Sequence, residues 1–196
     1  MASTEIRFQI PTPSRSSAIV AVKSFNSSLL RRSRGRDQAA AVCYRISDKG
    51  VEFLLVQTRN GCWTFPKGKV EPGLTPAQSA ALEAFEEAGV HGRIEEVSFM
   101  KYSRRSGKGL SEILVSAHLC EVLRQVAPQE SKRNPTWCSL EKSKRRLHDG
   151  RNPQTALGLF RVLETAVNRI ESLRQSYSPD QFARIPYIAI ETLKKR

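Results

Sequence analysis

The stretch "GKVEPGLTPAQSAALEAFEEAGV", residues 68–90, joins a loop rich in glycine and proline to a run of helix-forming residues. Thr75 is a residue type that caps helix N-termini, and Pro76 stands at the first helical position, where its missing N–H costs nothing. Gly89 suits the left-handed conformation that ends many helices. The stretch therefore predicts a loop followed by a helix over residues 75–88.

The predicted helix carries three carboxylates on one face, although the whole chain has a net charge of +13. Glu83, Glu86 and Glu87 stand at positions i, i+3 and i+4, where like charges repel by roughly a few tenths of a kcal/mol per pair. Such a face is either simply solvated or neutralised by a bound cation. Mg²⁺ prefers hard oxygen ligands, so the glycine-rich loop beside the carboxylates favours a divalent cation, Mg²⁺ or Mn²⁺, as cofactor.

The order and spacing of these residues resemble the Nudix box, G-x5-E-x7-R-E-U-x-E-E-x-G-U, in which U is an aliphatic residue. The resemblance rests on Gly68, Glu83, the pair Glu86–Glu87 and the pair Gly89–Val90. The preceding "LLVQTRNGCWTFPKGKVEPG" is also similar to the strand and loop of that family. This resemblance implies a Nudix-type α/β/α sandwich with a mixed β-sheet.

The resemblance also implies roles for individual residues. Glu83 and Glu87 match the family's metal ligands, and Glu86 matches the residue often assigned as the general base or a further ligand. The backbone carbonyl of Lys67 or Gly68 is a further oxygen ligand. The implied activity is that of a pyrophosphohydrolase, in which a carboxylate takes the proton of an attacking water.

Two further stretches favour a substrate class. "AAAVCYR" at the start of the domain and "EEAGVHG" at the end of the box most resemble the diphosphoinositol polyphosphate and diadenosine polyphosphate hydrolases. We therefore expect a phosphorylated small-molecule substrate with a diphosphate linkage, either a nucleoside polyphosphate or a diphosphoinositol polyphosphate.

Two positions depart from the box pattern. Leu74 stands where the family has its first glutamate, and Leu82 stands where it has arginine. In the family these side chains commonly form an ion pair that joins the loop to the helix. Replacing both partners of an ion pair with apolar groups is often neutral or stabilising, whereas replacing one leaves a charge without a partner. We therefore expect Leu74 and Leu82 to lie close together and mostly buried.

Basic residues are spread over the loops that follow or precede predicted strands. Because such loops can converge at one end of a sheet, we expect a single basic bowl that binds phosphates. The candidate substrate-binding residues are Arg59, Lys67, Arg104, Arg105, Arg133 and Arg151. Each basic run taken alone is better explained by a solvated surface, and only the runs taken together favour a polyphosphate ligand.

Hydrophobic patterning predicts strands at about 38–46, 51–58, 63–65, 92–102 and 112–122, with a short one near Trp137. Helices are expected at about 140–148 and 153–175. We accordingly assign residues 38–176 to the Nudix domain and residues 177–196 to a C-terminal extension whose apolar residues could dock on it. Residues 1–37, rich in serine and arginine, are expected to form a flexible basic arm.

Composition limits the location and the partners of the chain. Four scattered cysteines without a C-x-x-C pair fit a reducing compartment, and no apolar run is long enough to cross a bilayer. We expect a soluble, cytoplasmic protein, although the arm leaves organelle targeting open. No pattern defines an oligomeric state.

A second class of function fits the same chain. The basic composition and the two leucines fit a catalytically weak Nudix-like module that binds nucleic acid or another polyanion. Nucleic acid is the less favoured partner, because a polyanion binder without catalysis needs no cluster of glutamates and no aromatic-interleaved RNA-binding signature is present.

Overall fold

The structure is a computed structural model, and it describes residues 37–105, 112–176 and 187–190. All of these residues belong to one unit of the chain, residues 33–196. Nearly all of the expected N-terminal arm and most of the expected C-terminal extension lie outside the described residues.

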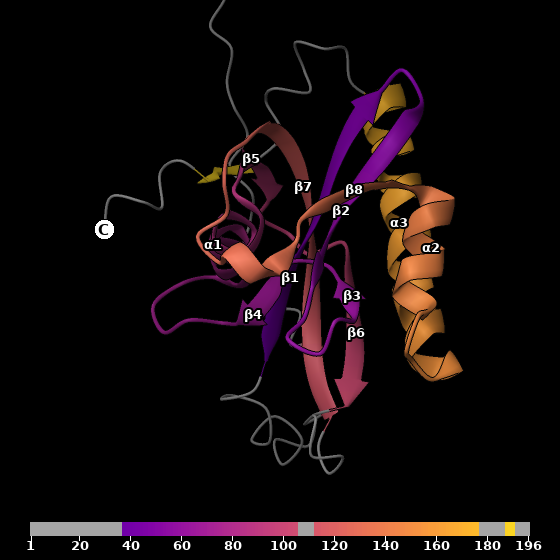
Figure 1. Cartoon of the computed structure of the whole chain (residues 1–196). Helices are drawn as coiled ribbons and strands as arrows, with labels where there is room; N and C mark the ends of the chain where they lie inside the picture. Colours follow the sequence, from indigo (N-terminus) through magenta and orange to yellow (C-terminus); the bar gives the residue numbers. More distant parts are fainter. Residues whose placement is uncertain (1–36, 106–111, 177–186, 191–196) are drawn as a thin grey trace, which may run out of the picture. The chain divides into compact units, whose positions relative to one another are not determined.

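A mixed β-sheet lies at the centre of the unit (Figure 1), and nine strands are seen in the described ranges. Its main path is β3-β2-β1-β7-β5-β9, with β4 and β6 added at the edges of β1 and β7, and β8 paired with β2. β1 and β7 run parallel, whereas the other pairs are antiparallel. The strands are β1 (Gln38–Ser47), β2 (Gly50–Gln57), β3 (Trp63–Thr64), β4 (Lys67–Lys69), β5 (Val90–Glu95), β6 (Met100–Arg105), β7 (Glu112–Gln125), β8 (Thr136–Ser139) and β9 (Tyr187–Ala189).

Helices cover both faces of this sheet. α1 (Pro76–Ala88) packs on one face, and α2 (Leu140–His148) and α3 (Pro153–Ser176) lie on the other, as Figure 1 shows. A 3-10 turn, η1 (Ser131–Arg133), precedes β8. The α/β/α sandwich with a mixed sheet is therefore confirmed.

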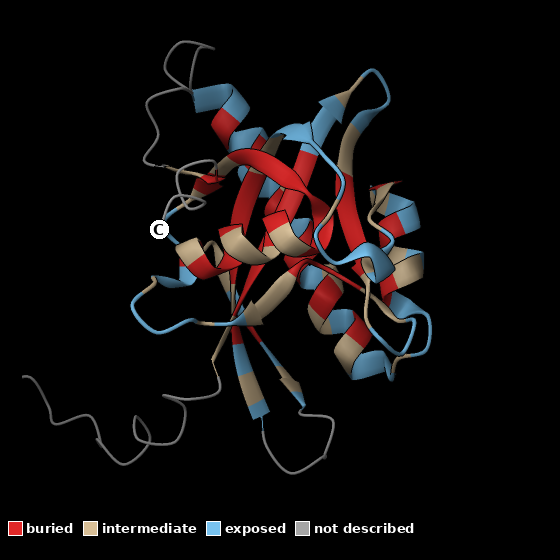
Figure 2. Cartoon of the chain, turned by 60° about the vertical axis from the view of Figure 1, so that its left-hand side comes forward, coloured by how far each residue is buried: buried red, intermediate tan, exposed pale blue. Residues whose placement is uncertain are grey.

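The central strand β1 is buried on both faces (Figure 2) because its side chains alternate between two cores. Ala39, Ala41 and Cys43 belong to the core under α1, whereas Ala40, Val42 and Tyr44 belong to the core under α3. The helix contributes mainly small side chains to the first core, namely Ala80, Ala81, Ala84, Phe85 and Ala88. Small side chains on both elements let α1 lie close to the strand.

The ends of α1 follow from local chemistry. The Thr75 hydroxyl accepts a hydrogen bond from the Gln78 backbone N–H (3.2 Å), and the Gln78 side chain accepts one from the Thr75 backbone N–H (2.9 Å). This capping box satisfies N–H groups that the first turn leaves without partners. Gly89 ends the helix at φ 66°, and its N–H bonds to the Phe85 carbonyl (2.9 Å). The predicted helix over residues 75–88 is confirmed.

Three features differ from the sequence prediction. The single strand expected over residues 92–102 is two strands, β5 and β6, because residues 96–99 turn the chain between them. The short strand β4 was not predicted, since three residues carry no detectable periodicity and depend on pairing with β1. The strand β9, which pairs with β5, was also not predicted, whereas the burial of Ile190 beside it agrees with the expectation that apolar residues of the extension dock on the domain.

In the part of the chain that the structure describes, no helix combines the length and the apolar character needed to span a membrane.

Candidate active site

The loop and the helix of the box meet at Gly68. A Cβ atom built on Gly68 would lie 1.5 Å from Oε1 of Glu83, so the carboxylate rests directly against the bare backbone of β4. One residue earlier, the Lys67 backbone N–H donates a hydrogen bond to Oε2 of Glu87 (3.2 Å). The structure thus brings together the three residues for which the sequence suggested a metal-binding role, Gly68, Glu83 and Glu87.

Negative charge is concentrated at this junction. Burial, together with the charges of Glu87, Glu86 and Glu130, raises the pKa of Glu83 to about 7, although Arg133 opposes the shift. Burial also raises the pKa of Glu86, with Glu130 contributing. Glu83, Glu86, Glu87 and Glu130 are thus close enough to raise one another's pKa values, and we call these four carboxylates the glutamate cluster.

Glu130 is a member of this cluster that the sequence did not reveal. Its backbone N–H donates to the Glu86 carbonyl (2.9 Å), which ties the segment before η1 to the end of α1. A lone glutamate in a polar loop, more than forty positions from Glu86, offers no signal in a single sequence.

The sequence suggested that Arg133 binds substrate. In the structure, its side chain is instead paired with carboxylates of the cluster. Its Nη2 lies 2.7 Å from Oε1 of Glu87, and its Nε lies 2.6 Å from Oε2 of Glu130. Glu87 is only 1% exposed. Burial raises the pKa of Glu87, while Lys67 and Arg133 oppose that rise. Arg133 is therefore in direct ion-pair contact with a buried carboxylate, whose charge Lys67 also stabilises.

The donor set fits a hard divalent cation. Its members are carboxylate oxygens on one helix and one loop, and Mg²⁺ or Mn²⁺ takes such ligands. Their charges raise one another's pKa values, and a divalent cation would offset that repulsion. As the side chains stand, no three His, Cys, Asp or Glu among the described residues are grouped closely enough to hold an ion together. The pairing of Glu87 with Arg133 gives a physical reason.

Next to Lys67 lies a first cavity, of about 270 Å³, in which basic side chains gather. Burial lowers the pKa of Lys67 to about 8; Glu87 opposes this shift, and three neighbouring arginines add to it. Crowded positive charge of this kind is expected of a site for an anion. The basic residues of the first cavity are Lys67, Arg104, Arg105 and Arg151.

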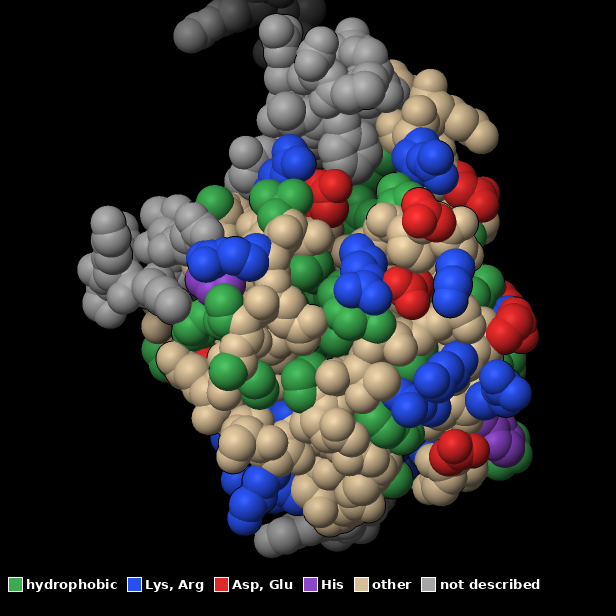
Figure 3. All heavy atoms as spheres, turned by 45° about the horizontal axis from the view of Figure 1, so that its top comes forward, with side chains coloured by type: hydrophobic (Ala, Val, Ile, Leu, Met, Phe, Trp, Pro, Cys, Tyr) green, Lys and Arg blue, Asp and Glu red, His purple; other side chains and the backbone are tan. Residues whose placement is uncertain are grey.

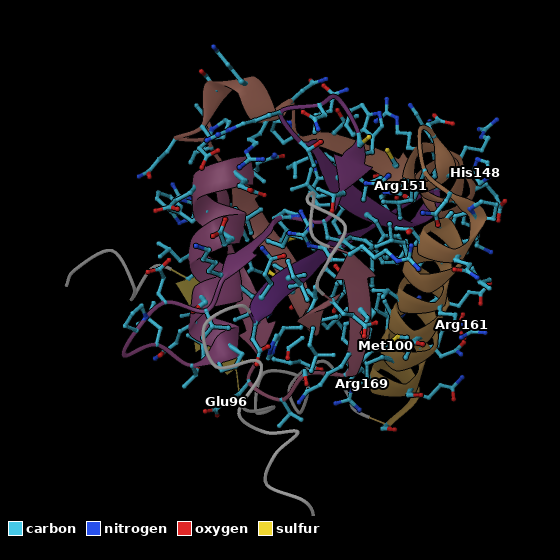
Figure 4. All side chains as sticks on the ribbon, turned by 90° about the horizontal axis from the view of Figure 1, so that it is seen from below. Glu96, Met100, His148, Arg151, Arg161 and Arg169 are labelled. Carbon is cyan, nitrogen blue, oxygen red and sulfur yellow. The ribbon has the colours of Figure 1, made fainter. Side chains whose placement is uncertain are left out.

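The three arginines of the first cavity differ in how they are held. Arg151 donates to the backbone carbonyls of Trp63 and Leu147, and in Figure 4 it lies inward of His148 at the junction of α2 and α3. Arg104 donates from Nε to the Gln38 side chain (2.9 Å). Arg105 is exposed. Arg151 therefore also stabilises the fold through these carbonyls, whereas the guanidinium of Arg105 is accessible to a ligand.

Tyr102 is a second residue that the sequence did not reveal. It lines the first cavity, is 8% exposed, and its hydroxyl has no hydrogen-bond partner among the described residues. A buried hydroxyl without a partner costs free energy. Its position among arginines makes it suitable as a donor to an anionic oxygen.

Arg59 lies elsewhere, in a second cavity of about 730 Å³ that Arg59, Lys132 and Arg133 line together with Glu130. Thr58 lines both cavities. The candidate residues thus line two cavities that share Thr58, and the single basic bowl that the sequence suggested stays a prediction.

Leu74 and Leu82 are both partly buried, and neither belongs to the two hydrophobic cores. Their mutual proximity, which the sequence suggested, stays a prediction.

Comparison with known proteins adds to this geometry. The model of the NUDIX domain matches residues 36–157, more than half of the 196-residue chain. The asymmetrical bis(5'-nucleosyl)-tetraphosphatase of Sus scrofa is 48% identical over 48 residues, which is 24% of this chain and 33% of that protein. Diphosphoinositol polyphosphate phosphohydrolase 2 of Rattus norvegicus is 41% identical over 61 residues, 30% of this chain and 34% of that protein. These matches span about one third of each relative.

Solved structures share the fold. The C. elegans Ap4A hydrolase in a binary complex superposes with a TM-score of 0.59 at 24% identity, over 70% of this chain and 98% of that one. The NUDIX domain of Shewanella oneidensis NrtR, crystallised with ADP ribose, gives a TM-score of 0.55 at 17% identity, over 75% and 94% of the two chains. The glycine–glutamate junction, the sandwich around it and the matching domain model together show that this chain belongs to the Nudix family.

Proposed function

We propose that this chain is a metal-dependent pyrophosphohydrolase that cleaves the diphosphate linkage of a phosphate-rich small molecule. The observation that carries the proposal is the junction at which Glu83 rests on Gly68 while the neighbouring backbone N–H of Lys67 binds Glu87. Such a junction fixes carboxylate oxygens beside backbone groups, as a catalytic metal site requires. The names of the relatives support the reaction type.

In this proposal Glu83, Glu87 and the carbonyl of Gly68 hold Mg²⁺ or Mn²⁺, with Glu130 close by. When bound, the ion supplies charge neutralisation and lowers the pKa of a coordinated water. The proton of the attacking water goes to the carboxylate of Glu86, the oxygen of that water bonds to phosphorus, and the bridging oxygen leaves. Glu86 suits this role because it is less buried than Glu83 and Glu87 and its pKa lies above the ordinary value.

The first cavity is the proposed site of the substrate's phosphates. Arg104, Arg105 and the Tyr102 hydroxyl provide donors there, and Lys67 connects the cavity to Glu87. Apart from Tyr102, no aromatic side chain lines either cavity in the described part of the chain. A substrate rich in phosphate, such as a diphosphoinositol polyphosphate or a dinucleoside polyphosphate, therefore fits better than one bound mainly through base stacking.

The competing interpretation, a polyanion-binding module, has less support. The face drawn in Figure 3 has acidic side chains among its basic ones, in place of a continuous basic surface. Nucleic-acid sites usually gather Lys and Arg on one face. A cytoplasmic location fits the four cysteines, which are all unpaired.

The test is a substrate panel with the purified chain. Diadenosine tetraphosphate, a diphosphoinositol polyphosphate, ADP-ribose and nucleoside triphosphates are incubated with Mg²⁺, Mn²⁺ or EDTA, and phosphate release and product mass are measured. We expect metal-dependent cleavage of a polyphosphate substrate. Glu83→Gln and Glu87→Gln should lose turnover by orders of magnitude while still binding substrate, because the shape is kept and only the charge is lost.

Glu164→Gln serves as the matched control, since Glu164 is an exposed glutamate on α3 that pairs with Lys144 (3.3 Å) far from the box. Glu86→Gln should be as damaging as the other two changes if Glu86 is the base. Absence of cleavage across the panel, combined with tight RNA binding at physiological salt, would replace the enzyme proposal with the binding module.

A further inference from the structure

The contact between Arg133 and Glu87 joins parts of the chain that no local pattern relates. Glu87 lies on the last turn of α1 and is 1% exposed, whereas Arg133 ends η1 and is about one fifth exposed at its side chain. Their atoms approach to 2.7 Å. A charge-assisted contact of this length to a buried carboxylate is among the stronger interactions in a protein.

The same carboxylate is the one that a divalent cation would use. Oε1 of Glu87 accepts Arg133, and Oε2 accepts the Lys67 backbone N–H, so both oxygens of Glu87 are already engaged. A cation coordinated through Oε1 would lie close to the guanidinium that contacts the same oxygen, and the two positive charges would repel each other.

We propose that Arg133 is an internal counterion that holds the place of the divalent cation on Glu87 and is displaced when the cation binds. This inference rests on the proposed metal-dependent function. Arg133 thereby stabilises the chain without metal and weakens its affinity for metal. It acts as a positioning residue that sets the metal concentration at which the site forms.

The surrounding contacts indicate which part of Arg133 moves. The η1 backbone is held on one side by the Glu130 N–H to the Glu86 carbonyl (2.9 Å), and on the other by the Asn134 side chain, which donates to Gln57 (3.3 Å). The change is therefore confined to the Arg133 side chain. That side chain lines the second cavity with Arg59 and Lys132, so the displaced guanidinium turns toward a space already rich in basic groups.

The experiment titrates Arg133→Gln and wild type with Mn²⁺. Binding is measured by calorimetry and by the loss of the free Mn²⁺ signal in electron paramagnetic resonance. We expect Arg133→Gln to bind Mn²⁺ about tenfold more tightly, which corresponds to loss of one charge-assisted contact. Without metal, its melting temperature should fall by several degrees, because the buried carboxylate of Glu87 loses the arginine with which it is in direct contact.

Lys132→Gln is the matched control. Lys132 is the preceding residue, is exposed, lines the same cavity and carries the same charge, but has no ion pair in the described part of the chain. It should change the Mn²⁺ dissociation constant by less than about twofold, since an exposed charge is screened by solvent. Arg133→Lys should give intermediate values, and it replaces Arg133→Gln if that variant does not fold.

Linkage provides a second readout. Saturating Mn²⁺ should raise the melting temperature of Arg133→Gln by more than that of wild type, because the metal then has no internal competitor to displace. The proposal would be overturned if Mn²⁺ raised the melting temperatures of Arg133→Gln and wild type equally. It would also be overturned if Arg133→Gln bound Mn²⁺ no more tightly than Lys132→Gln, or more weakly than wild type. Failure of wild type itself to bind Mn²⁺ would instead refute the proposed metal-dependent function.

Discussion

The carboxylate of Glu83 fills the space that any side chain at position 68 would need, since a Cβ on Gly68 would lie 1.5 Å from its Oε1 and 2.9 Å from its Oε2. Gly68 is thus required by close approach and not by an unusual backbone angle, because its φ is not among the positive values. The absence of a side chain at Gly68 therefore lets the carboxylate of Glu83 contact the backbone of β4 directly.

Gly68→Ala should separate activity from stability. The methyl group meets the mobile end of the Glu83 side chain, so the carboxylate is pushed aside while the free energy of unfolding changes by less than about 1 kcal/mol. Displacement of a catalytic ligand by about 1 Å can cost on the order of a hundredfold in turnover. Thermal unfolding and steady-state kinetics measure the two effects.

Gly158→Ala is the control for this change. Gly158 lies within α3 and has nothing within 4 Å of an added Cβ. It should raise the free energy of unfolding by about 0.5–1 kcal/mol and leave turnover unchanged. A large loss of stability in Gly68→Ala would show that Glu83 is held too rigidly to move.

A double-mutant cycle tests whether Leu74 and Leu82 replace an ion pair. Leu82→Arg alone should lower the free energy of unfolding by about 1–2 kcal/mol, because a partly buried charge has no partner. Adding Leu74→Glu should recover at least about 0.5 kcal/mol of that loss if the side chains are neighbours. Urea unfolding of the four proteins measures the coupling, and strictly additive effects would contradict the proposed proximity.

Arg105 and Arg151 should respond differently to the same substitution. Arg105→Gln should raise KM for a polyphosphate about tenfold without changing stability, since Arg105 is exposed and lends only its charge. Arg151→Gln should in addition lower the free energy of unfolding by about 1–3 kcal/mol, because the carbonyls of Trp63 and Leu147 lose their donor. Equal stabilities of the two variants would mean that Arg151 has no structural task.

His118 should make stability depend on pH. It is 2% exposed, its Nδ1 lies 3.1 Å from the Glu95 carbonyl, and burial lowers its pKa, an effect that this hydrogen bond opposes and Lys101 reinforces. As the pH falls below about 6.5, this histidine takes up a proton in the unfolded chain before it does so in the folded chain. The free energy of unfolding therefore falls as the pH is lowered through that value, and is retained above it.

Chemical unfolding between pH 7 and pH 5 measures this slope. His118→Asn keeps an amide donor near the Glu95 carbonyl but cannot titrate, so its slope should be shallower than that of wild type. Parallel curves for wild type and His118→Asn would refute the assignment.

The sequence predicted those features that local chemistry determines. The helix boundaries follow from Thr75, Pro76 and Gly89, each of which acts on backbone groups within a few residues of itself. The glutamates of the box converge with Gly68 because the loop is short. The fold class also follows from the order of strands and helices.

The sequence could not predict contacts made by distant segments. Glu130 and Arg133 reach the cluster only because β7 returns the chain to the end of α1, where the Val126 N–H bonds to the Gly89 carbonyl (2.9 Å). Arg133 and Arg59 were assigned to the same site as Arg104 by charge alone. Charge carries no information about which cavity a side chain enters.

The contact between the alanine residues of α1 and β1 makes the geometry of the candidate site depend on the distance between this helix and this strand. In the pairing of β1 with β4, Ala39 lies opposite Gly68 and Ala40 lies opposite Lys67. β1 therefore positions the backbone that Glu83 contacts, and it also provides the methyl groups that pack against α1. A single added methyl group at Ala41 or Ala84 would move α1 away from Gly68 without changing any candidate site residue. The small alanine side chains between α1 and β1 are therefore as important for the geometry of the site as the charged residues that form it.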